Sequence, residues 1–198
     1  MTVTDPSTLP RGQQERRARI VEAAIDLLRG GEYDAIQMRD IADGAGVALA
    51  TIYRYFTSKE HLYAAALVEW SAGFPTLGRA GRPSGSTPED RLRALMRRAV
   101  RAFERYPQMM RAEIMLESSH DANAHALFQQ FASQNTAALL DALDGIEPSV
   151  AASIIDVVNA VLATRLRSWA LGRCSIRGVD RSVQQAIDLV FAPQPPSA

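Results

Sequence analysis

The sequence has one cysteine, Cys174, and only two tryptophans among 198 residues. A single thiol excludes an intrachain disulfide, so we expect a protein of a reducing compartment. No apolar run approaches the roughly 20 residues that cross a membrane. The first ten residues, MTVTDPSTLP, lack the apolar core of a signal peptide. These absences predict a cytoplasmic protein without a membrane partner.

Net charge is also missing, because 22 basic residues balance 22 acidic ones. The first 62 residues hold eight Arg or Lys against nine Asp or Glu, so this segment is not basic overall. Strongly basic surfaces are typical of nucleic-acid-binding proteins, and the balance argues mildly against that class. Positive charge is placed locally instead, at Arg11, Arg16, Arg17, Arg19, Arg39, Arg54 and Lys59. Local placement is enough for phosphate contacts if the acidic residues face away.

Signatures of catalysis and metal binding do not stand out. The sequence shows no Ser-His-Asp arrangement, glycine-rich phosphate loop or paired carboxylates. His120 and His125 are five residues apart, which does not place them on one helix face. We therefore predict no metal site and no cofactor. An enzyme whose site is dispersed through the fold stays an alternative, which turnover by the purified protein would reveal.

Apolar residues recur at helical spacing, and no alternation of period two is long enough for a sheet. The sequence therefore predicts an all-α protein of nine helices. Four precede a Gly-, Pro- and Ser-rich segment at residues 75–88, PTLGRAGRPSGSTP, and five follow it. The predicted parts are a disordered arm at 1–12, a first domain at 13–73, a second domain at 74–191 and a disordered tail at 192–198.

Residues 37–60, QMRDIADGAGVALATIYRYFTSKE, have the spacing of a helix-turn-helix. Ile41 and Ala45 share one face of a first short helix, and Gly46 can adopt a positive φ at the turn. A second helix would then carry Val47, Ile52 and Tyr55 inward. Its other face is small and polar, which suits phosphates and base edges. Gln37 stands where Ser or Thr would cap the first helix, so we predict a weak start there.

From Ala42 to Leu62 the chain resembles the DNA-binding motif of the TetR family, A-x-x-A-G-V-x-x-x-T-[IL]-Y-x-[YH]-F-x-[SN]-K-[ED]-x-L. The resemblance implies a nine-helix fold in which the first domain binds DNA and the second binds an effector and a second copy. It also implies a homodimeric repressor, released from a palindromic double-stranded DNA operator by a small hydrophobic effector. The predicted DNA-binding residues are Arg39, Ala48, Leu49, Ala50, Thr51, Tyr53, Arg54, Tyr55 and Lys59.

The strings QMRDIAD and ATIYRYFTSKEHL, with an arginine-rich helix after residue 88, are similar to an actinobacterial branch of that family. This branch includes regulators of sterol and lipid catabolism, so the effector would be a lipid, a sterol derivative or an acyl-CoA. The alternative is a helical carrier of apolar ligands in which the DNA-binding motif is vestigial. Salt-sensitive DNA binding would distinguish the two.

Methionine and aromatic residues are frequent in the predicted second domain. Such adaptable side chains can line an apolar cavity, although each of them also suits a filled core. The family resemblance favours the cavity. The predicted effector-binding residues are Met96, Phe103, Met110, Ile114, Met115, Phe128, Phe131 and Trp169.

Two further groups in this half have alternative interpretations. Six arginines lie between residues 91 and 105, and they form either a solvated face or partners for an anionic effector: Arg91, Arg93, Arg97, Arg98, Arg101 and Arg105. The helix predicted from Pro148 to Leu171 is apolar nearly all round, which predicts burial on two sides. We expect one side to meet a second copy through Ile155, Val158, Leu162, Val183 and Ile187.

Overall fold

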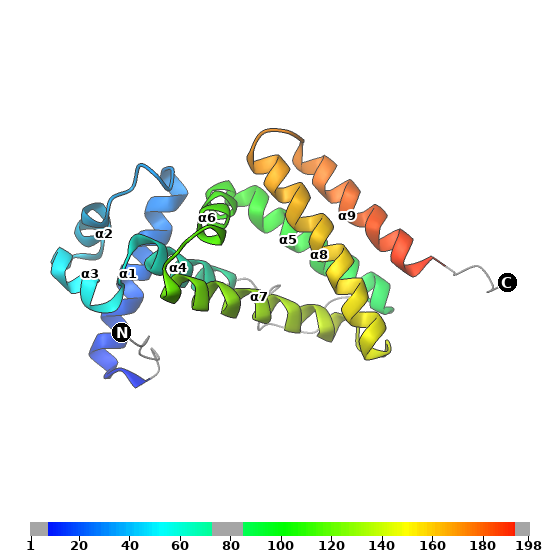
Figure 1. The fold of residues 1–198 in the computed structure, drawn as a ribbon, viewed down its shortest axis with the longest axis horizontal. Coiled ribbons are helices and arrows are strands. Elements are labelled where there is room, and N and C mark those ends of the chain that lie inside the picture. Colours follow the sequence, from blue (N-terminus) through cyan, green and yellow to red (C-terminus); the bar gives the residue numbers. More distant parts are fainter. Residues whose placement is uncertain (1–7, 73–84, 193–198) are drawn as a thin grey trace. The chain divides into compact units, whose positions relative to one another are not determined.

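The computed structural model describes residues 8–72 and 85–192. Within these ranges it has nine helices and no strand, as the sequence predicts (Figure 1). The helices are α1 Arg11–Gly30, α2 Met38–Ala45, α3 Leu49–Tyr55, α4 Lys59–Ala72, α5 Pro88–Arg105, α6 Pro107–Glu117, α7 Ala122–Ala142, α8 Pro148–Ala170 and α9 Ile176–Phe191. The described residues leave out most of three predicted segments: the arm at 1–12, the Gly-, Pro- and Ser-rich segment at 75–88 and the tail at 192–198.

The described residues form two compact units. The N-terminal unit combines residues 8–72 with 111–132, and the C-terminal unit combines 85–110 with 133–192. Helices α6 and α7 therefore each contribute to both units. The sequence predicts residues 111–132 as part of the second domain, whereas their packing groups them with the N-terminal helices.

In the N-terminal unit, α1 packs along α4 and against α2. Ile20 and Leu28 of α1 are fully buried, and Tyr33 and Ile36 in the following loop close the join as predicted. The rings of Tyr33 and Tyr63 meet edge to face with centroids 5.0 Å apart. Helix α4 is buried more widely than the predicted apolar stripe, because every side chain from 61 to 67 is buried.

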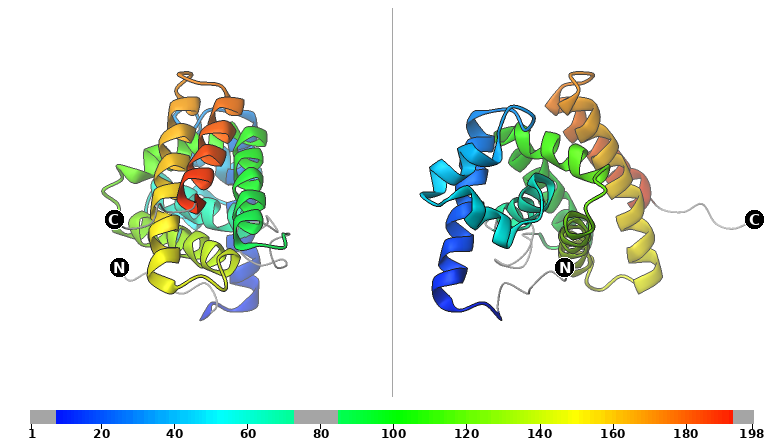
Figure 2. Two further views of the ribbon diagram at one scale, coloured as in Figure 1. Left: turned by 90° about the vertical axis from the view of Figure 1, so that its right-hand side faces the viewer. Right: turned by 60° about the vertical axis from the view of Figure 1, so that its left-hand side comes forward.

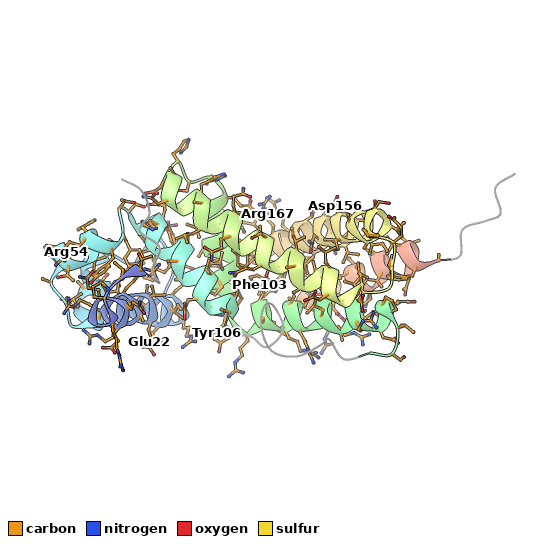
Figure 3. The ribbon with its side chains drawn as sticks, turned by 90° about the horizontal axis from the view of Figure 1, so that it is seen from below. Glu22, Arg54, Phe103, Tyr106, Asp156 and Arg167 are labelled. Carbon is orange, nitrogen blue, oxygen red and sulfur yellow. The ribbon has the colours of Figure 1, made fainter. Side chains whose placement is uncertain are left out.

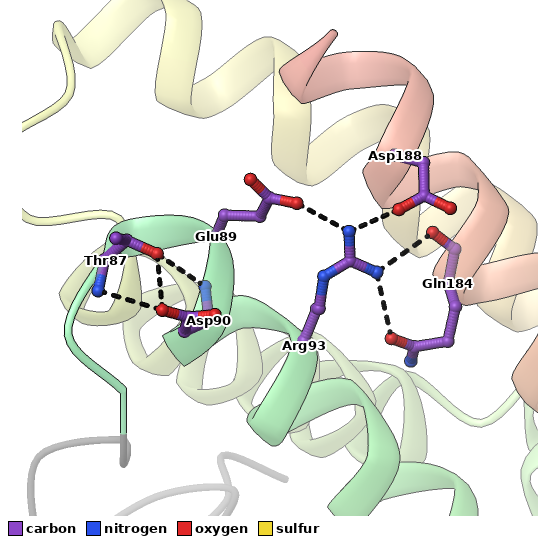
Figure 4. Close-up of polar contacts among 6 residues, drawn as sticks. All are labelled: Thr87, Glu89, Asp90, Arg93, Gln184 and Asp188. Carbon is purple, nitrogen blue, oxygen red and sulfur yellow. Dashed lines mark hydrogen bonds and ion pairs between the residues drawn. The ribbon is translucent and has the colours of Figure 1, made fainter.

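In the C-terminal unit, α8 and α9 lie side by side and α5 packs against α9 (Figures 1 and 2). Arg93 of α5 connects this helix to α9 (Figure 4). Its guanidinium donates to Glu89 Oε1 at 2.5 Å and to Asp188 of α9, and Nη1 lies 3.4 Å from Gln184 Oε1. These contacts raise the pKa of Arg93, with the hydrogen bond to Glu89 as the main cause.

Thr87 begins α5 with a capping box. Its hydroxyl accepts from the Asp90 amide at 3.1 Å, and its own amide donates to Asp90 Oδ2 at 3.3 Å (Figure 4). Two amides that lack partners inside the helix are thereby satisfied. Pro88 occupies the first helical position, where its fixed φ is compatible with the helix. The predicted start of this helix is confirmed.

Helix α8 is, within the described ranges, the one helix long and apolar enough to cross a membrane. The prediction that no apolar segment approaches that length was wrong, because valines, isoleucines and leucines, with interspersed alanines, keep the hydropathy of α8 high between its few charges. Only 28% of its most apolar window is buried inside the chain. The outer side of α8 therefore presents apolar surface that the chain itself does not cover.

Candidate nucleic-acid interface

Helix α2 begins at Met38 although Gln37 is a poor cap by residue type. Asp40, at the third helical position, accepts the Gln37 amide proton on Oδ2 at 2.7 Å. A carboxylate in the first turn also complements the positive end of the helix dipole. The weak start predicted from Gln37 is therefore corrected, since the capping group is Asp40.

Gly46 ends α2 in the left-handed conformation, with φ 64° and ψ 42°. The Val47 amide donates to Ala42 O at 3.0 Å and the Gly46 amide to Asp43 O at 3.2 Å, which is the Schellman arrangement of a helix end. No atom lies within 4 Å of the position that a Cβ of Gly46 would occupy. Glycine is therefore required here for its backbone conformation, as predicted, and not for space.

Helix α3 is anchored by Ile52 and by Phe56 just beyond its end, both fully buried. Tyr55 also faces inward, and its hydroxyl is buried. Val47 is only half-buried and precedes the helix instead of lying within it. The exposed face consists of Ala48, Ala50, Tyr53 and Arg54, with Leu49 and Thr51 half-buried at its margin. Figure 3 labels Arg54 at the N-terminal unit.

Arg39 lies in the first turn of α2 and is exposed. Within the described part of the chain it makes no hydrogen bond or ion pair, not even with Asp43 one turn further along α2. Its guanidinium therefore keeps five donors available for a partner outside the chain.

Lys59, at the start of α4, is half-buried and already has a partner. Its ammonium donates to the carbonyl oxygen of Tyr33 and lies 4.2 Å from the centroid of the Tyr33 ring. Burial lowers the pKa of Lys59, and Asp34 opposes this effect. The predicted backbone-binding lysine thus also fixes the loop after α1, a role that its place in the motif does not reveal.

Two of the locally placed arginines are engaged within the N-terminal unit. Arg17 lies with its guanidinium carbon 5.1 Å from the centroid of the Phe56 ring, and burial lowers its pKa, with Glu69 acting in the opposite direction. Arg11 pairs with Glu15 one turn along α1. Arg17 therefore supports the end of α3 through Phe56, whereas Arg11 and Glu15 form an exposed pair on α1.

A polar cluster at the turn between α3 and α4 was not predicted. The Thr57 hydroxyl donates to Asp121 Oδ2 at 3.0 Å and accepts from Asn123 Nδ2 at 3.0 Å. The Thr57 amide donates to His61 Nδ1 at 3.1 Å, and Ser58 Oγ accepts the His61 amide at 2.9 Å, so Ser58 caps α4. The turn that follows the exposed helix is therefore bonded to the turn that precedes α7.

The cluster also determines how His61 is protonated. Because an amide donates to its Nδ1, the ring is neutral and carries its proton on Nε2. Burial lowers the pKa of His61, and Asp121 opposes this effect. At Asp121, burial raises the pKa, but hydrogen bonds from Ser58, the Ala124 amide and Thr57 outweigh it and the net shift is downward. The cluster thus holds a neutral histidine beside an ionised carboxylate.

The eight predicted effector-binding residues are divided between the two units. Met96, Phe103 and Met110 are buried in the C-terminal unit, where Trp169 is half-buried. The other four belong to the N-terminal unit, where Phe131 is buried, Ile114 and Phe128 are half-buried, and Met115 is 42% exposed. Met115 is therefore no part of a buried lining. The rings of Phe128 and Phe131 lie 6.2 Å apart.

The six arginines after residue 88 do not share one role. Arg91 is buried and donates from Nε to Ala142 O and from Nη2 to Asp144 O, both at 2.8 Å, which satisfies carbonyls at the end of α7. Arg93 makes the contacts already described, and Arg105 lies over the Tyr106 ring at 5.6 Å. Arg97 and Arg101 are exposed and have no such contact within the described ranges.

Four of the five predicted dimer-interface residues are core residues of a single chain. Val183 and Ile187 are fully buried, Val158 is 1% exposed and Ile155 is 3% exposed, because α8 and α9 pack these side chains against each other and α5. Within a single chain these four side chains are therefore already covered, and their place in a dimer interface stays a prediction. Leu162 is half-buried. Exposed apolar residues lie on other faces of the same helices, at Val150, Val157, Leu171 and Leu189.

Known proteins similar to this chain are transcriptional regulators. Residues 20–66 match the family of bacterial regulatory proteins, tetR family, and residues 85–190 match the tetracyclin repressor-like C-terminal domain. The HTH-type transcriptional repressor KstR of Rhodococcus jostii (strain RHA1) is 30% identical over 96% of this chain and 89% of its own length. KstR of Mycobacterium tuberculosis is 31% identical over 92% of this chain and 83% of its own length. These relatives agree with the predicted actinobacterial branch.

Solved structures give the same result. A TetR transcriptional regulator from Rhodococcus sp. RHA1 superposes with a TM-score of 0.75 and 26% identity, over 93% of this chain and all of that chain. FadR from Bacillus subtilis, in complex with stearoyl-CoA, has the same fold at a TM-score of 0.66 and 16% identity, over 88% and 97% of the two chains. With both profiles matched and the helix-turn-helix geometry in place, the chain belongs to the TetR family of bacterial regulatory proteins and is a ligand-responsive transcriptional regulator, not an enzyme.

Proposed function

We propose that the protein is a homodimeric repressor whose two α3 helices enter successive major grooves of a palindromic operator. A small hydrophobic effector, of the lipid, sterol or acyl-CoA class, would release it from DNA. The observation that carries the proposal is the combination of a rigidly anchored α3 with an exposed small-residue face and an unpaired arginine on α2. Such a face fits a major groove, in which small side chains allow close approach and an arginine reads a base.

Within this face some residues would contact bases and others would contact the phosphate backbone. Arg39 is free to donate two hydrogen bonds to the edge of a guanine, the commonest specific contact of its kind. Thr51, Tyr53 and Lys59 suit phosphate oxygens, which position the helix without reading sequence. Ala48, Leu49, Ala50 and Arg54 would line the groove. Tyr55 differs from the others, because its buried hydroxyl supports α3 from behind.

The dimer would form through the outer faces of α8 and α9. Exposed residues recur along α8 at intervals of three or four, at Val150, Ser153, Val157, Ala160 and Thr164, and Leu171 just beyond its end is also exposed. Leu189 of α9 is 77% exposed. Heptad-like spacing of small and apolar residues is the pattern by which helices pack in bundles. This surface differs from the one predicted from sequence and also explains the apolar outer side of α8.

The effector would bind among the buried side chains of the C-terminal unit. Met96, Phe103 and Met110 supply apolar contacts, and methionine adapts its shape to a ligand. Gln108 Oε1 and Asn135 Oδ1 are buried in the same unit and lack hydrogen-bond partners within the described ranges. A ligand that carries a donor would satisfy such oxygens, whose burial otherwise costs free energy. FadR, which has this fold, binds an acyl-CoA, but at its low identity the likeness concerns the fold alone.

One experiment tests the whole scheme. Genomic fragments that the purified protein retains would be sequenced, and the operator found would be titrated with long-chain acyl-CoA, a steroid acid and small polar metabolites. We expect the apolar ligands to release DNA and to raise the melting temperature, since a ligand at 100 times its Kd stabilises the folded state by about 2.7 kcal/mol. Release by polar metabolites with no effect of lipids would refute the effector class. Failure to retain any fragment at low salt would refute the repressor.

A further inference from the structure

The C-terminal unit has a pocket between α5 and the start of α9 that plays no part in the scheme above. Its volume is about 540 Å³, within the range of small-molecule sites. Arg97 and Arg101 line it from α5, one turn apart, and Arg177 lines it from the first turn of α9. Three guanidinium groups on two packed helices thus converge on one cavity.

These three arginines differ from Arg91 and Arg93 in their lack of hydrogen-bond and ion-pair partners within the described residues. Arg91 and Arg93 donate to carbonyls or carboxylates inside the chain, whereas Arg97, Arg101 and Arg177 make no hydrogen bond or ion pair within the residues described. Two carboxylates, Glu104 and Asp180, also line the pocket, but neither lies within ion-pairing distance of the three. The three positive charges therefore stay uncompensated by close partners.

The backbone at this point also favours an anion. Ser175 caps α9, and its hydroxyl accepts the Gly178 amide at 3.1 Å. The amides of Ile176 and Arg177, at the first two helical positions, have no acceptor inside the helix. They lie at the positive end of the helix dipole. Val100 and Ile176 give the pocket its apolar lining.

We propose that this pocket binds a phosphorylated small molecule that also carries hydroxyl groups. Phosphate oxygens would accept from Arg97, Arg101 and Arg177, since guanidinium groups match phosphate with paired hydrogen bonds. Glu104 and Asp180 would accept from ligand hydroxyls and would repel a second anionic group at their side. The two carboxylates thus fix the orientation of the ligand and select against ligands that are anionic at both ends. The site requires neither operator binding nor an apolar effector.

Titration calorimetry of the dimeric protein without DNA tests the proposal, with inorganic phosphate, ADP and coenzyme A as separate probes. We expect saturable binding of one ligand per chain, weakened about tenfold in Arg101→Gln, which corresponds to ~1.4 kcal/mol. Asp180→Asn removes a charge that repels phosphate but keeps an oxygen that can accept from a hydroxyl, so it should tighten binding several-fold, which a damaged protein could not do. Tighter binding of ADP or coenzyme A than of phosphate supports a phosphorylated ligand with hydroxyl groups, and equal binding of all three would overturn the proposed contacts to hydroxyls.

The matched control is Arg181→Gln, which removes the same charge from an exposed position on α9 that does not line the pocket. We expect it to bind all three probes with wild-type affinity. Equal weakening in Arg181→Gln and Arg101→Gln would reduce the effect to net charge and overturn the proposal. Absence of saturable binding of every probe at millimolar concentration would also overturn it, even if the protein represses its operator as proposed.

Discussion

The Thr57 hydroxyl donates a 3.0 Å hydrogen bond to Oδ2 of Asp121, 64 residues further along the chain. Thr57 follows the helix proposed to read DNA, and Asp121 directly precedes α7. The same carboxylate accepts the amides of Asn123 and Ala124 through Oδ1, at 2.8 and 3.0 Å, and so caps α7. One aspartate therefore holds the beginning of α7 and the end of the helix-turn-helix.

Removal of the hydroxyl should measure what this bond contributes. Thr57→Val keeps the shape of the side chain but leaves Asp121 and Asn123 each without one partner. We expect a loss of about 0.5–1.5 kcal/mol in the free energy of unfolding by urea, while Thr57→Ser stays near wild type. A double-mutant cycle of Thr57→Val with Asp121→Ala should give a coupling of similar size. Strict additivity would show that the two residues do not act together.

His61 should make stability decline as pH falls below about 6.5, the ordinary pKa of histidine. Burial lowers its pKa in the folded state, so the unfolded chain binds the proton first as pH falls below the ordinary value of about 6.5. Stability is therefore complete above that value and declines below it. The pKa of Asp121 is also lowered, so its contribution is lost only at much lower pH, below about 4.

The measurement is the urea midpoint at several pH values for wild type and His61→Gln. The glutamine has no ionisable group, and its oxygen can still accept the Thr57 amide. We expect a decline in this pH range for wild type and a flat profile for the variant. A parallel decline in both would assign the effect to other groups.

Arg39→Ala should change DNA binding without changing stability, because Arg39 is exposed and makes no contact within the described part of the chain. We expect a loss of about 1–3 kcal/mol on the operator and relaxed preference at one base pair of each half-site. Competition among single-base operator variants gives the preference, and thermal unfolding gives the control. A lowered melting temperature would contradict the proposed role.

Lys59→Ala should affect both properties. It removes the hydrogen bond to Tyr33 and the contact with its ring, which should cost about 1–2 kcal/mol of stability. DNA binding should weaken equally on all sequences, and the slope of affinity against salt should fall by about one unit. Titrations at several salt concentrations, with Arg39→Ala in parallel, separate the two roles. An unchanged slope would leave Lys59 with its structural role alone.

Two valines distinguish the outer face of α8 and α9 from their core. Val157 is 48% exposed, so Val157→Asp should yield a folded monomer with unchanged helical content at micromolar concentration. Val183 is fully buried, and Val183→Asp should unfold the chain because a charge enters the core without a partner. Sedimentation equilibrium and circular dichroism give both results. A dimeric Val157→Asp would place the interface elsewhere.

The sequence predicts local features of this protein well. The nine helices, the turn at Gly46 and the caps at Ser58 and Thr87 depend on residues within a few positions of one another. The motif also identifies the exposed face of α3, because Ile52 and Phe56 recur at helical spacing. These features follow from propensity and periodicity, which act over short distances along the chain.

Contacts between distant segments could not be predicted. Nothing near Arg91 indicates that it caps α7 some fifty residues later, and nothing near Thr57 indicates Asp121 as its partner. The two sides of α8 could not be told apart for a related reason. On a helix as apolar as α8, the pattern does not distinguish Val158, which faces α9, from Val157, which faces outward. Only the packing of α8 on α9 selects the inner face.

The outer face of α8 has a consequence for the gene that encodes the protein. If only the dimer formed through this face can bind both half-sites of an operator, the concentration of active repressor rises with the square of the protomer concentration when the protein is scarce. Halving expression would then cut the pool of competent repressor about fourfold in that regime, by mass action. Regulation would thus respond steeply to the amount of protein in the cell. A chain that cannot bind DNA but still presents Val150, Val157 and Leu171 would form inactive mixed dimers with normal chains and act as a dominant-negative inhibitor.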